Sequence, residues 1–294
     1  MNLNQLKAFY LTVKTGSITK AAQALSVTPP AISKSLNKLQ EFYNINLIMP
    51  CGKGMTTTVF GDEIFEMAEN IFDLERMLES RLGEQQKSVN SKINIAASQS
   101  FAAYYLPPIL DYFARIYHKC DVQVEMKPTR EVYSDVHHGI ADIGIASYQL
   151  ENCHVENQKG VQERLVAICT PNHPWAARSA IKAEMLRNQV LINHENGSFP
   201  CSKLLEIMNK LDIDHNQIKY IMTSNEAIKQ MVMRGIGIAL ISEKAIQSEV
   251  ASGKLVSLEL EQIDTTRRFY ICRHKNKYIT EPMQILLKLL TKSL

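Results

Sequence analysis

The stretch QLKAFYLTVKTGSITKAAQALSVTPPAISKSLNKLQEFYNINL (residues 5–47) decides the fold of the N-terminal part of this 294-residue chain. Apolar residues recur at helical spacing in its first third, and Gly16 stands where that helix is expected to end. Ser17 suits the N-cap of a second helix. Thr28, followed by two prolines, suits the N-cap of a third helix over about 29–43. Two short helices joined by a tight turn predict a helix-turn-helix.

The third helix combines an apolar stripe with a face that carries Ser33, Lys34, Asn37 and Lys38. In a helix-turn-helix the start of the second helix of the pair meets base edges in the DNA major groove, while lysines neutralise phosphates. The following segment, 47–58, predicts a hairpin with a lysine near its tip, which would act as a wing. The alternative is a helical bundle with a solvated basic face, and the pattern alone favours neither.

Charge is divided unevenly along the chain. Residues 1–58 contain six lysines, no arginine and one acid, a net charge of +5, whereas the remainder has 27 bases and 29 acids, a net charge of −2. A basic head on a mildly acidic body indicates a polyanion partner at one end.

Composition excludes several classes of protein. With 45% hydrophobic and 21% charged residues the chain is typical of soluble globular proteins. No run approaches the roughly 18 apolar residues of a membrane span, and the N-terminus has no signal pattern, so we expect a cytoplasmic protein with no membrane partner. The six cysteines lie far apart without a CxxC motif, and we expect them to be reduced.

Residues 59 to about 86 predict one long helix with a heptad seam. The seam alternates spacings of four and three residues and consists of Phe60, Ile64, Met67, Ile71, Leu74 and Leu78. Such a helix favours dimerisation, with two heads held about a two-fold axis to read a palindromic site. The alternative is that the seam packs within its own chain. The polar segment 88–92 predicts a joint.

Residues 92–294 alternate strands and helices, which predicts an α/β sheet with helices on both faces. The expected elements include a strand over 164–170 and a helix over 242–252. Ligands of this class bind at the carboxyl ends of strands. Polar residues stand at several such ends: Ser98, Gln99, Ser100, Thr129, Ser147, Asn196, Ser198 and Thr223. Each alone is typical of an N-cap, but the repetition predicts one shared ligand cleft.

Catalytic and metal-binding motifs are absent from the sequence. It contains no HExxH, GxSxG or GxxxxGK[ST] pattern. His137 and His138 are adjacent, and neighbours in a helix point about 100° apart, which makes a poor chelate. We therefore expect neither an enzyme nor a bound metal or cofactor. Cys201 follows a strand end and precedes a helix, where a thiolate is favoured, so a redox switch is an alternative.

The first 65 residues resemble the LysR-type transcriptional regulators. The matching positions are Leu6, Phe9, Val13, Gly16, Ser17, Ala21, Ala22, Leu25, Pro30, Ala31, Ser33, Leu39 and Leu47, followed by Thr58 and Gly61 at the start of the long helix. The resemblance continues more loosely through GIADIGIAS (139–147), LVAICTPNHPWA (165–176) and the segment 223–258, so it covers essentially the whole chain.

The resemblance implies an α/β protein with three parts. These are a winged helix-turn-helix over 1–58, a linker and dimerisation helix over 59–88, and an effector-binding domain over 92–294 that is similar to the type 2 periplasmic binding proteins. By analogy the first lobe comprises 92–161 and 267–294, the second lobe comprises 162–266, and a small molecule binds between them. Members of the family commonly form tetramers.

The resemblance also implies site residues. DNA contacts would fall on Thr28, Pro29, Pro30, Ser33, Lys34 and, at the wing, Lys53, and the primary effector segment would be Ser98–Ser100. Two departures stand out. Pro29 replaces a glutamine that could read adenine bidentately, and Ile48-Met49-Pro50 replaces a Phe-x-Arg whose arginine contacts phosphate.

The sequence therefore predicts a DNA-binding transcriptional regulator, a homodimer or homotetramer, controlled by a small polar or anionic metabolite. RNA polymerase is a candidate partner. The alternatives are an enzyme with a DNA-binding head, an architectural DNA-binding protein without a ligand, and the redox-sensing regulator.

Overall fold

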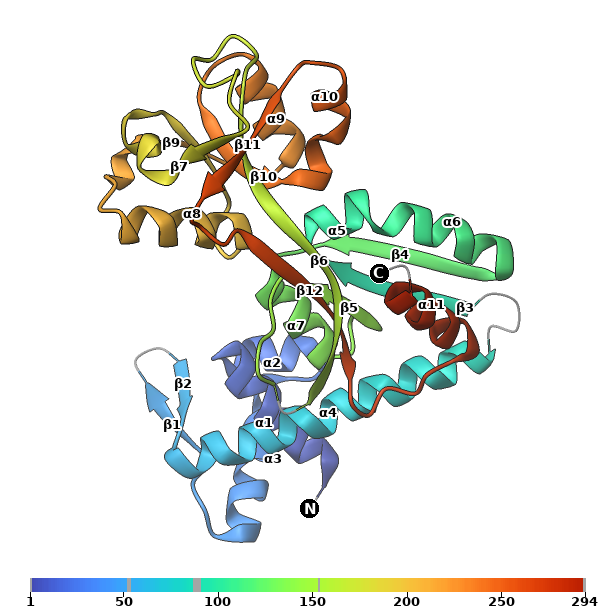
Figure 1. Ribbon diagram of the computed structural model, residues 1–294. Coiled ribbons are helices and arrows are strands. Elements are labelled where there is room, and N and C mark those ends of the chain that lie inside the picture. The colour runs from blue at the N-terminus through green and yellow to red at the C-terminus, as the bar shows by residue number, and fades with distance from the viewer. Residues whose placement is uncertain (1, 52–53, 87–90, 153, 293–294) are drawn as a thin grey trace. The chain divides into compact units, whose positions relative to one another are not determined.

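The computed structural model describes residues 2–51, 54–86, 91–152 and 154–292. The chain divides into two compact units, Met1–Gln86 and Lys87–Leu294, each with its own buried core. Figure 1 labels the helices and strands of both.

The first unit is a helical head with a two-stranded hairpin and one long helix. Its elements are α1 (Leu3–Thr15), α2 (Ile18–Ala24), α3 (Pro29–Tyr43), β1 (Ile48–Cys51), β2 (Gly54–Thr57) and α4 (Val59–Gln86). The hairpin is antiparallel, with Ile48 opposite Thr57 and Cys51 opposite Gly54. The helix-turn-helix, the hairpin and the long helix predicted from sequence are all present.

Local signals fix the helix ends of the head. Gly16 ends α1 in the left-handed region (φ 64°), where glycine carries no steric penalty. The Ser17 hydroxyl then accepts a hydrogen bond from the Lys20 N–H at 3.4 Å and caps α2. Thr28 precedes α3 as predicted, but its side chain makes no cap hydrogen bond. The next two residues are prolines without an N–H, and the Ala31 N–H is bonded to the Thr28 carbonyl.

Close approaches of backbone explain two small residues at the start of α4. A Cβ on Gly61 would lie 2.0 Å from the Leu47 carbonyl oxygen, so only glycine fits there. Thr58 caps the helix: its hydroxyl accepts from the Gly61 N–H at 2.9 Å and donates to the Asn46 carbonyl at 2.8 Å. These contacts tie α4 to the end of the head, and its Ala68 and Phe72 are buried in the core of the head.

The second unit is an α/β structure. Its elements before the middle of the chain are β3 (Ser91–Ala97), α5 (Gln99–Tyr104), α6 (Leu106–Ile116), β4 (Cys120–Met126), α7 (Thr129–His137), β5 (Ile143–Ala146) and β6 (Val155–Cys169). These are followed by β7 (Ala180–Lys182), β8 (Leu191–His194), α8 (Phe199–Lys210), β9 (Ile218–Met222), α9 (Asn225–Met233) and β10 (Ile238–Ser242). The last elements are α10 (Gln247–Ala251), β11 (Val256–Glu261), β12 (Thr266–His274) and α11 (Glu281–Lys292). Short 3-10 helices lie at 183–188, 215–217 and 243–246.

One continuous sheet runs through this unit in the order β4-β3-β5-β12-β6-β10-β8-β9, and β11 pairs with both β6 and β7. The first part of β6 pairs with β12, and its last part, from Leu165, pairs with β10. These two long strands therefore join two halves, as Figure 1 shows. Each half has its own hydrophobic core. Within each half, parallel strands alternate with helices, so their carboxyl ends face the junction.

Four elements differ from the sequence prediction. The strand expected over 164–170 begins nine residues earlier, at Val155. Its first part, VENQKGVQER, is polar because this stretch is only partly buried, and so the hydrophobic pattern does not mark it. Strands β7 and β11 were not predicted. The helix expected over 242–252 is a 3-10 turn followed by the five-residue α10.

Candidate functional sites

The first candidate site is the exposed face of α3. Thr28, Pro29, Pro30, Lys34 and Lys38 are exposed, and Ser33 is partly buried with its hydroxyl donating to the Pro29 carbonyl at 3.3 Å. A shallow surface groove runs along this face, lined by Pro29, Pro30, Ser33, Lys34, Asn37, Lys38 and Glu41. The sequence-predicted residues of this helix thus share one open surface.

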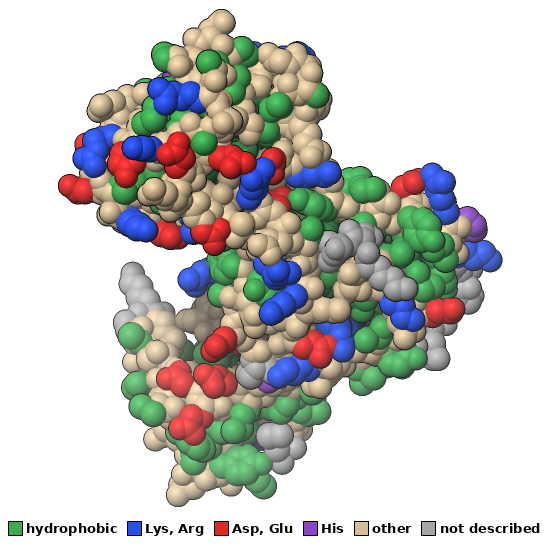
Figure 2. Space-filling view, viewed as in Figure 1, with side chains coloured by type: hydrophobic (Ala, Val, Ile, Leu, Met, Phe, Trp, Pro, Cys, Tyr) green, Lys and Arg blue, Asp and Glu red, His purple; other side chains and the backbone are tan. Residues whose placement is uncertain are grey.

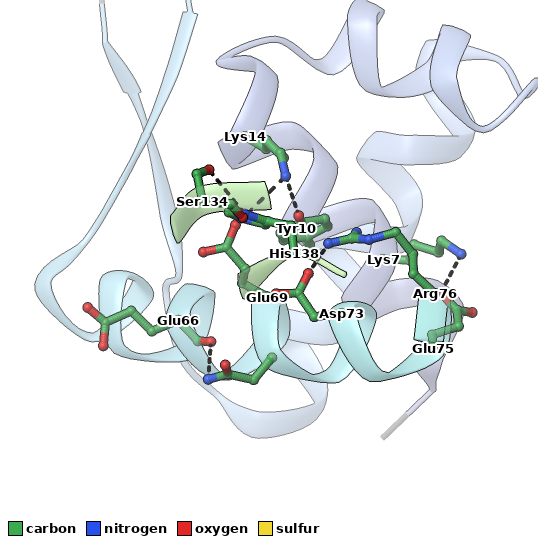
Figure 3. A network of polar contacts seen from close by, with 11 residues as sticks. Lys7, Tyr10, Lys14, Glu66, Glu69, Asp73, Glu75, Arg76, Ser134 and His138 are labelled. Carbon is green, nitrogen blue, oxygen red and sulfur yellow. Dashed lines mark hydrogen bonds and ion pairs between the residues drawn. The ribbon is translucent and has the colours of Figure 1, made fainter. Parts of the chain in front are cut away.

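Two other lysines of the head contact side chains of the first unit: Lys7 contacts α4, and Lys14 contacts both α1 and α4. The Lys7 Nζ lies 2.7 Å from Glu75 Oε2, and the Lys14 Nζ lies 2.6 Å from the Tyr10 hydroxyl and 3.7 Å from Glu69 Oε1 (Figure 3). The net charge of +5 counted for the head therefore overstates the charge available to a partner.

The hairpin packs on the turn between α1 and α2. The Met55 N–H donates to the Gly16 carbonyl at 3.3 Å, and the Gln40 side chain accepts from the Leu47 N–H at 2.8 Å. These bonds hold the hairpin beside α3, as a wing requires. Lys53, the predicted wing contact, lies outside the described residues. Pro50, which stands where the family has an arginine, is exposed on β1.

The predicted dimerisation seam of α4 has two kinds of member. Ile64 and Ile71 are partly buried against the core of the head. The other four are exposed, with relative exposures of 46% for Phe60, 61% for Met67, 46% for Leu74 and 59% for Leu78. Part of the seam therefore packs within its own chain, and the rest is an apolar stripe on the surface of α4.

The second candidate site is a cavity of about 260 Å³ where the two halves of the Lys87–Leu294 unit meet. Seven of the predicted residues line it: Ser98, Gln99, Ser100, Thr129, Ser147, Ser198 and Thr223. Asn196 does not. It is exposed in the turn before α8, because Glu195 and Ser198 take the positions that face the cavity.

Strand ends and helix starts place these side chains, as the alternation of elements predicts. Ser98 follows β3, Thr129 begins α7, and the Ser147 N–H after β5 donates to the Thr129 hydroxyl at 3.0 Å. Gln99 connects the two halves: its side-chain amide donates to the Thr223 carbonyl at 2.9 Å and accepts from the Asn225 N–H at 3.2 Å.

Sequence reasoning missed eight lining residues: Met126, Lys127, Pro128, His194, Glu195, Phe199, Pro200 and Arg267. Arg267 matters most, because it is a buried cation at the start of β12. Its guanidinium pairs with Glu163, with Nε 2.6 Å from Oε1, and it stacks over the Phe269 ring at 4.6 Å. Its Nη1 reaches the Ser147 hydroxyl only at 3.5 Å.

The lining residues also hold polar atoms that lack hydrogen-bond partners. Ser98 Oγ, His194 Nε2, Glu195 Oε2 and Asn225 Nδ2 are buried and make no hydrogen bond to any described residue. Burial lowers the pKa of His194 to about 4, so its ring is neutral at pH 7. Buried polar groups without partners are costly, and their concentration here marks a place where a ligand would supply the missing bonds.

Cys201 does not have the environment of a reactive thiolate, which counts against the alternative of a redox switch. It is buried, and that burial raises the pKa of its thiol. The Asn193 amide donates to its Sγ at 3.3 Å, and no other described cysteine forms a disulfide with it.

Three histidines far apart in sequence come together at the far ends of α7 and β12. The ring centroids of His137 and His154 are 5.0 Å apart, and that of His274 lies 6.3 and 6.1 Å from them. Burial, followed by the neighbouring His137, His154 and Lys277, lowers the pKa of His274 to about 4. The His274 ring is therefore neutral at pH 7, and the Asn276 N–H donates to its Nδ1 at 3.1 Å.

Comparison with known families decides what kind of protein carries these two sites. Residues 3–62 match the bacterial regulatory helix-turn-helix of the lysR family, and residues 86–294 match the LysR substrate binding domain. The chain belongs to the LysR family of transcriptional regulators. It is a DNA-binding regulator with an effector-binding domain and not an enzyme. No helix of the described residues is long and apolar enough to cross a membrane.

Relatives resemble this LysR regulator along almost its whole length. The transcriptional activator CmpR of Synechocystis is 25% identical over 95% of this chain and 91% of its own length. The regulator CysL of Bacillus subtilis is 24% identical over 91% of this chain and 89% of its own length.

Solved structures of LysR regulators share the fold. Corynebacterium glutamicum OxyR, solved as a C206 mutant, has a TM-score of 0.59 at 19% identity, and the match covers 98% of this chain and 91% of its own. The Synechocystis CcmR regulatory domain in complex with 2-PG has a TM-score of 0.64 at 24% identity and covers 69% of this chain and 97% of its own.

Proposed function

We propose that this regulator is controlled by a small polar or anionic metabolite that binds the cavity between the two halves of the Lys87–Leu294 unit. The observation that carries the proposal is the set of unpartnered polar atoms on its wall. The cavity of about 260 Å³ lies close to the lower end of the range of about 300–1,000 Å³ that is usual for small-molecule pockets, which suits a small metabolite.

The helix starts around the cavity favour a negative charge on that metabolite. Thr129, Phe199 and Asn225 are the first residues of α7, α8 and α9, and all three line the cavity. The N-terminus of a helix carries a partial positive charge and unpaired N–H groups, so it attracts anions. The Arg267 Nη1 and the Ser98 hydroxyl add donors to the same wall.

We propose further that the exposed face of α3 binds operator DNA through Thr28, Pro29, Pro30, Ser33, Lys34 and Lys38, with Lys53 on the wing. The chain forms a homodimer or homotetramer through α4, in which the stripe of Phe60, Met67, Leu74 and Leu78 packs against a second copy. Two heads on a two-fold axis would read two half-sites one helical turn apart or a multiple of it.

Effector and DNA are coupled in this proposal. The metabolite closes the cavity and stabilises one arrangement of the oligomer, which changes the spacing or angle of the heads on DNA and their contact with RNA polymerase. Because the coupling is a free energy between two binding sites, it acts equally in both directions.

The test uses the full-length chain and a metabolite identified by thermal shift. Ser100→Ala, at a buried lining position, should raise the Kd of that metabolite about tenfold while leaving operator affinity without metabolite unchanged. Ser202→Ala, an exposed serine on α8 outside the cavity, is the matched control. A loss of operator binding in Ser100→Ala without metabolite would mean that Ser100 is structural, and an unchanged metabolite Kd would contradict the assignment of the cavity.

A further inference from the structure

Glu195 is a carboxylate held in the cavity wall without a cation. It follows β8, and its backbone is fixed at both ends: its N–H donates to the Met222 carbonyl at 3.1 Å, and its carbonyl accepts from the Ser198 hydroxyl at 2.9 Å. Its side chain lines the cavity, and Oε2 is buried with no hydrogen-bond partner among the described residues.

The other charged side chains of the cavity wall are already paired. Arg267 is neutralised by Glu163, and Lys127 lies 2.5 Å from Asp135 and 3.0 Å from Glu125. Glu195 has no such ion pair with any residue that the structure describes. Burial raises the pKa of Glu195, and only a hydrogen bond from its own backbone opposes that rise. The unmatched charge of the cavity is therefore a negative one.

A second acceptor lies next to it in sequence and in the same wall. The neutral His194 ring is hydrogen-bonded to the Leu240 backbone, and its Nε2 is buried without a hydrogen-bond partner among the described residues, so this nitrogen can serve as an acceptor. Two hydrogen-bond acceptors without donors favour a ligand group with several N–H bonds. The unpaired carboxylate also favours a ligand group that carries a positive charge.

Donors are unpartnered elsewhere on the wall. Ser98 Oγ and Asn225 Nδ2 are buried and make no hydrogen bond within the described part of the chain, and Arg267 Nη1 has one long contact. These groups suit an acid, as the proposed function holds. The cavity thus has both an acid-binding set and an unmatched acceptor set within a space of about 260 Å³.

We infer that the effector is a small zwitterion of the amino-acid type, whose ammonium group pairs with Glu195 and whose acid group binds the donors on Ser98, Asn225 and Arg267. This inference rests on the proposed function, since it names the class of metabolite that the same cavity takes. Pairing with the ammonium group offsets the cost of burying the Glu195 charge, and His194 Nε2 is a further acceptor for its N–H groups.

The experiment is a thermal-shift and calorimetric titration of the full-length protein at pH 7. The probes are the standard α-amino acids and small β- and γ-amino acids at millimolar concentration, and each is paired with the acid that lacks its amino group. At least one amino acid should bind. Its partner acid should bind at least about tenfold more weakly, because it lacks the ammonium group and so loses one charge-assisted contact.

Variants separate the two halves of the inference. Glu195→Gln keeps the size of the side chain and removes its charge, so it should weaken the amino acid about tenfold and leave the partner acid unchanged or tighter. Ser98→Ala should weaken both. The unliganded Glu195→Gln protein should unfold at a temperature no lower than the wild type, which confirms that it is folded.

Three results would overturn the inference: no amino compound binds, the partner acid binds as tightly, or Glu195→Gln leaves the Kd of the amino acid unchanged. A plain acid that is weakened by Ser98→Ala and not by Glu195→Gln would refute the ammonium site alone and leave the cavity as the effector site. A ligand whose Kd neither variant changes would refute the proposed function as well.

Discussion

At the scale of single residues, the buried pair of Arg267 and Glu163 should dominate the stability of the cavity wall. Arg267 is 4% exposed and Glu163 9% exposed, and Glu163 also accepts from the Tyr105 hydroxyl at 2.6 Å and the Ser242 hydroxyl at 2.8 Å. Arg267→Met leaves the Glu163 charge buried and unpaired, so we expect a loss of about 3–5 kcal/mol in the free energy of unfolding, measured by urea denaturation.

The double variant Glu163→Gln/Arg267→Met is the control, because it removes both charges and leaves only neutral groups. It should recover most of the stability lost in the single variant. A single variant that loses less than about 1 kcal/mol would show that the pair is accessible to water and not buried as described.

Two histidines should make the protein sensitive to acid. The pKa values of His194 and His274 are lowered to about 4 in the folded chain by burial, against about 6.5 in an unfolded one. Between about pH 4 and pH 6.5 the unfolded state binds more protons than the folded state. The free energy of unfolding therefore falls as the pH drops from 7 towards 4. His194→Gln and His274→Gln should each reduce that fall by about 1–3 kcal/mol in unfolding experiments across this range. Parallel curves for wild type and variants would contradict the assignment.

Residues whose role is local could be predicted from sequence, and residues whose role depends on tertiary pairing could not. Ser98, Thr129 and Ser147 stand at strand ends beside helix starts, a position that sequence pattern alone identifies. Arg267 is followed by a second basic residue, Arg268, and nothing in the sequence pattern sets it apart. It becomes a buried cation only because β12 pairs with β6 and thereby places Glu163 against it.

At the scale of elements, α4 carries an apolar stripe that a soluble helix would not keep exposed without a partner. Leu78 is 59% exposed on this stripe. Leu78→Glu places a charge in the proposed seam, so we expect dissociation of the oligomer at micromolar concentration in analytical ultracentrifugation, with the helical content retained.

Asn70→Glu is the matched control, since it adds the same charge to the same helix. At 100° per residue, position 70 lies about 80° from position 78 and about 40° from position 74 around α4, on the flank of the stripe. This variant should remain an oligomer. If the oligomers of both variants dissociate, the added charge acts on the helix in general and not on the seam. If neither oligomer dissociates, α4 is not the interface.

The elements show where hydrophobic pattern predicts structure and where it does not. The helices of the head were predicted because caps and apolar spacing agree, as at Gly16 and Ser17. The first part of β6 was missed because VENQKGVQER (155–164) is held by pairing with β12 and is only partly buried. Backbone pairing of that kind leaves little trace in side-chain pattern.

At the scale of the whole molecule, the charge of the DNA-binding unit is divided between the head and the long helix α4. The Met1–Gln86 unit holds eight basic and nine acidic residues, because α4 is rich in acids while the head is rich in lysines. Figure 2 shows acidic side chains gathered over the N-terminal half of α4. In the proposed binding mode, the attraction of this unit for DNA would therefore depend on the lysines of α3 and not on its net charge.

Lys34 tests that dependence. It is exposed on the proposed DNA face, so Lys34→Ala should weaken operator binding and reduce the slope of log K against log salt by about 0.9, the value for one phosphate contact. Lys210→Ala, an exposed lysine at the end of α8 in the other unit, should leave the slope unchanged. An unaltered slope in Lys34→Ala would contradict a phosphate contact there.

The central claim is that the cavity and the DNA-binding face are thermodynamically coupled. The most direct measurement is a closed cycle: the Kd for operator DNA with and without saturating metabolite, and the Kd for the metabolite with and without operator. The account predicts a change of about 5- to 150-fold that is equal along both arms. An operator Kd and a DNA footprint that do not change on adding a metabolite bound in the cavity would contradict it.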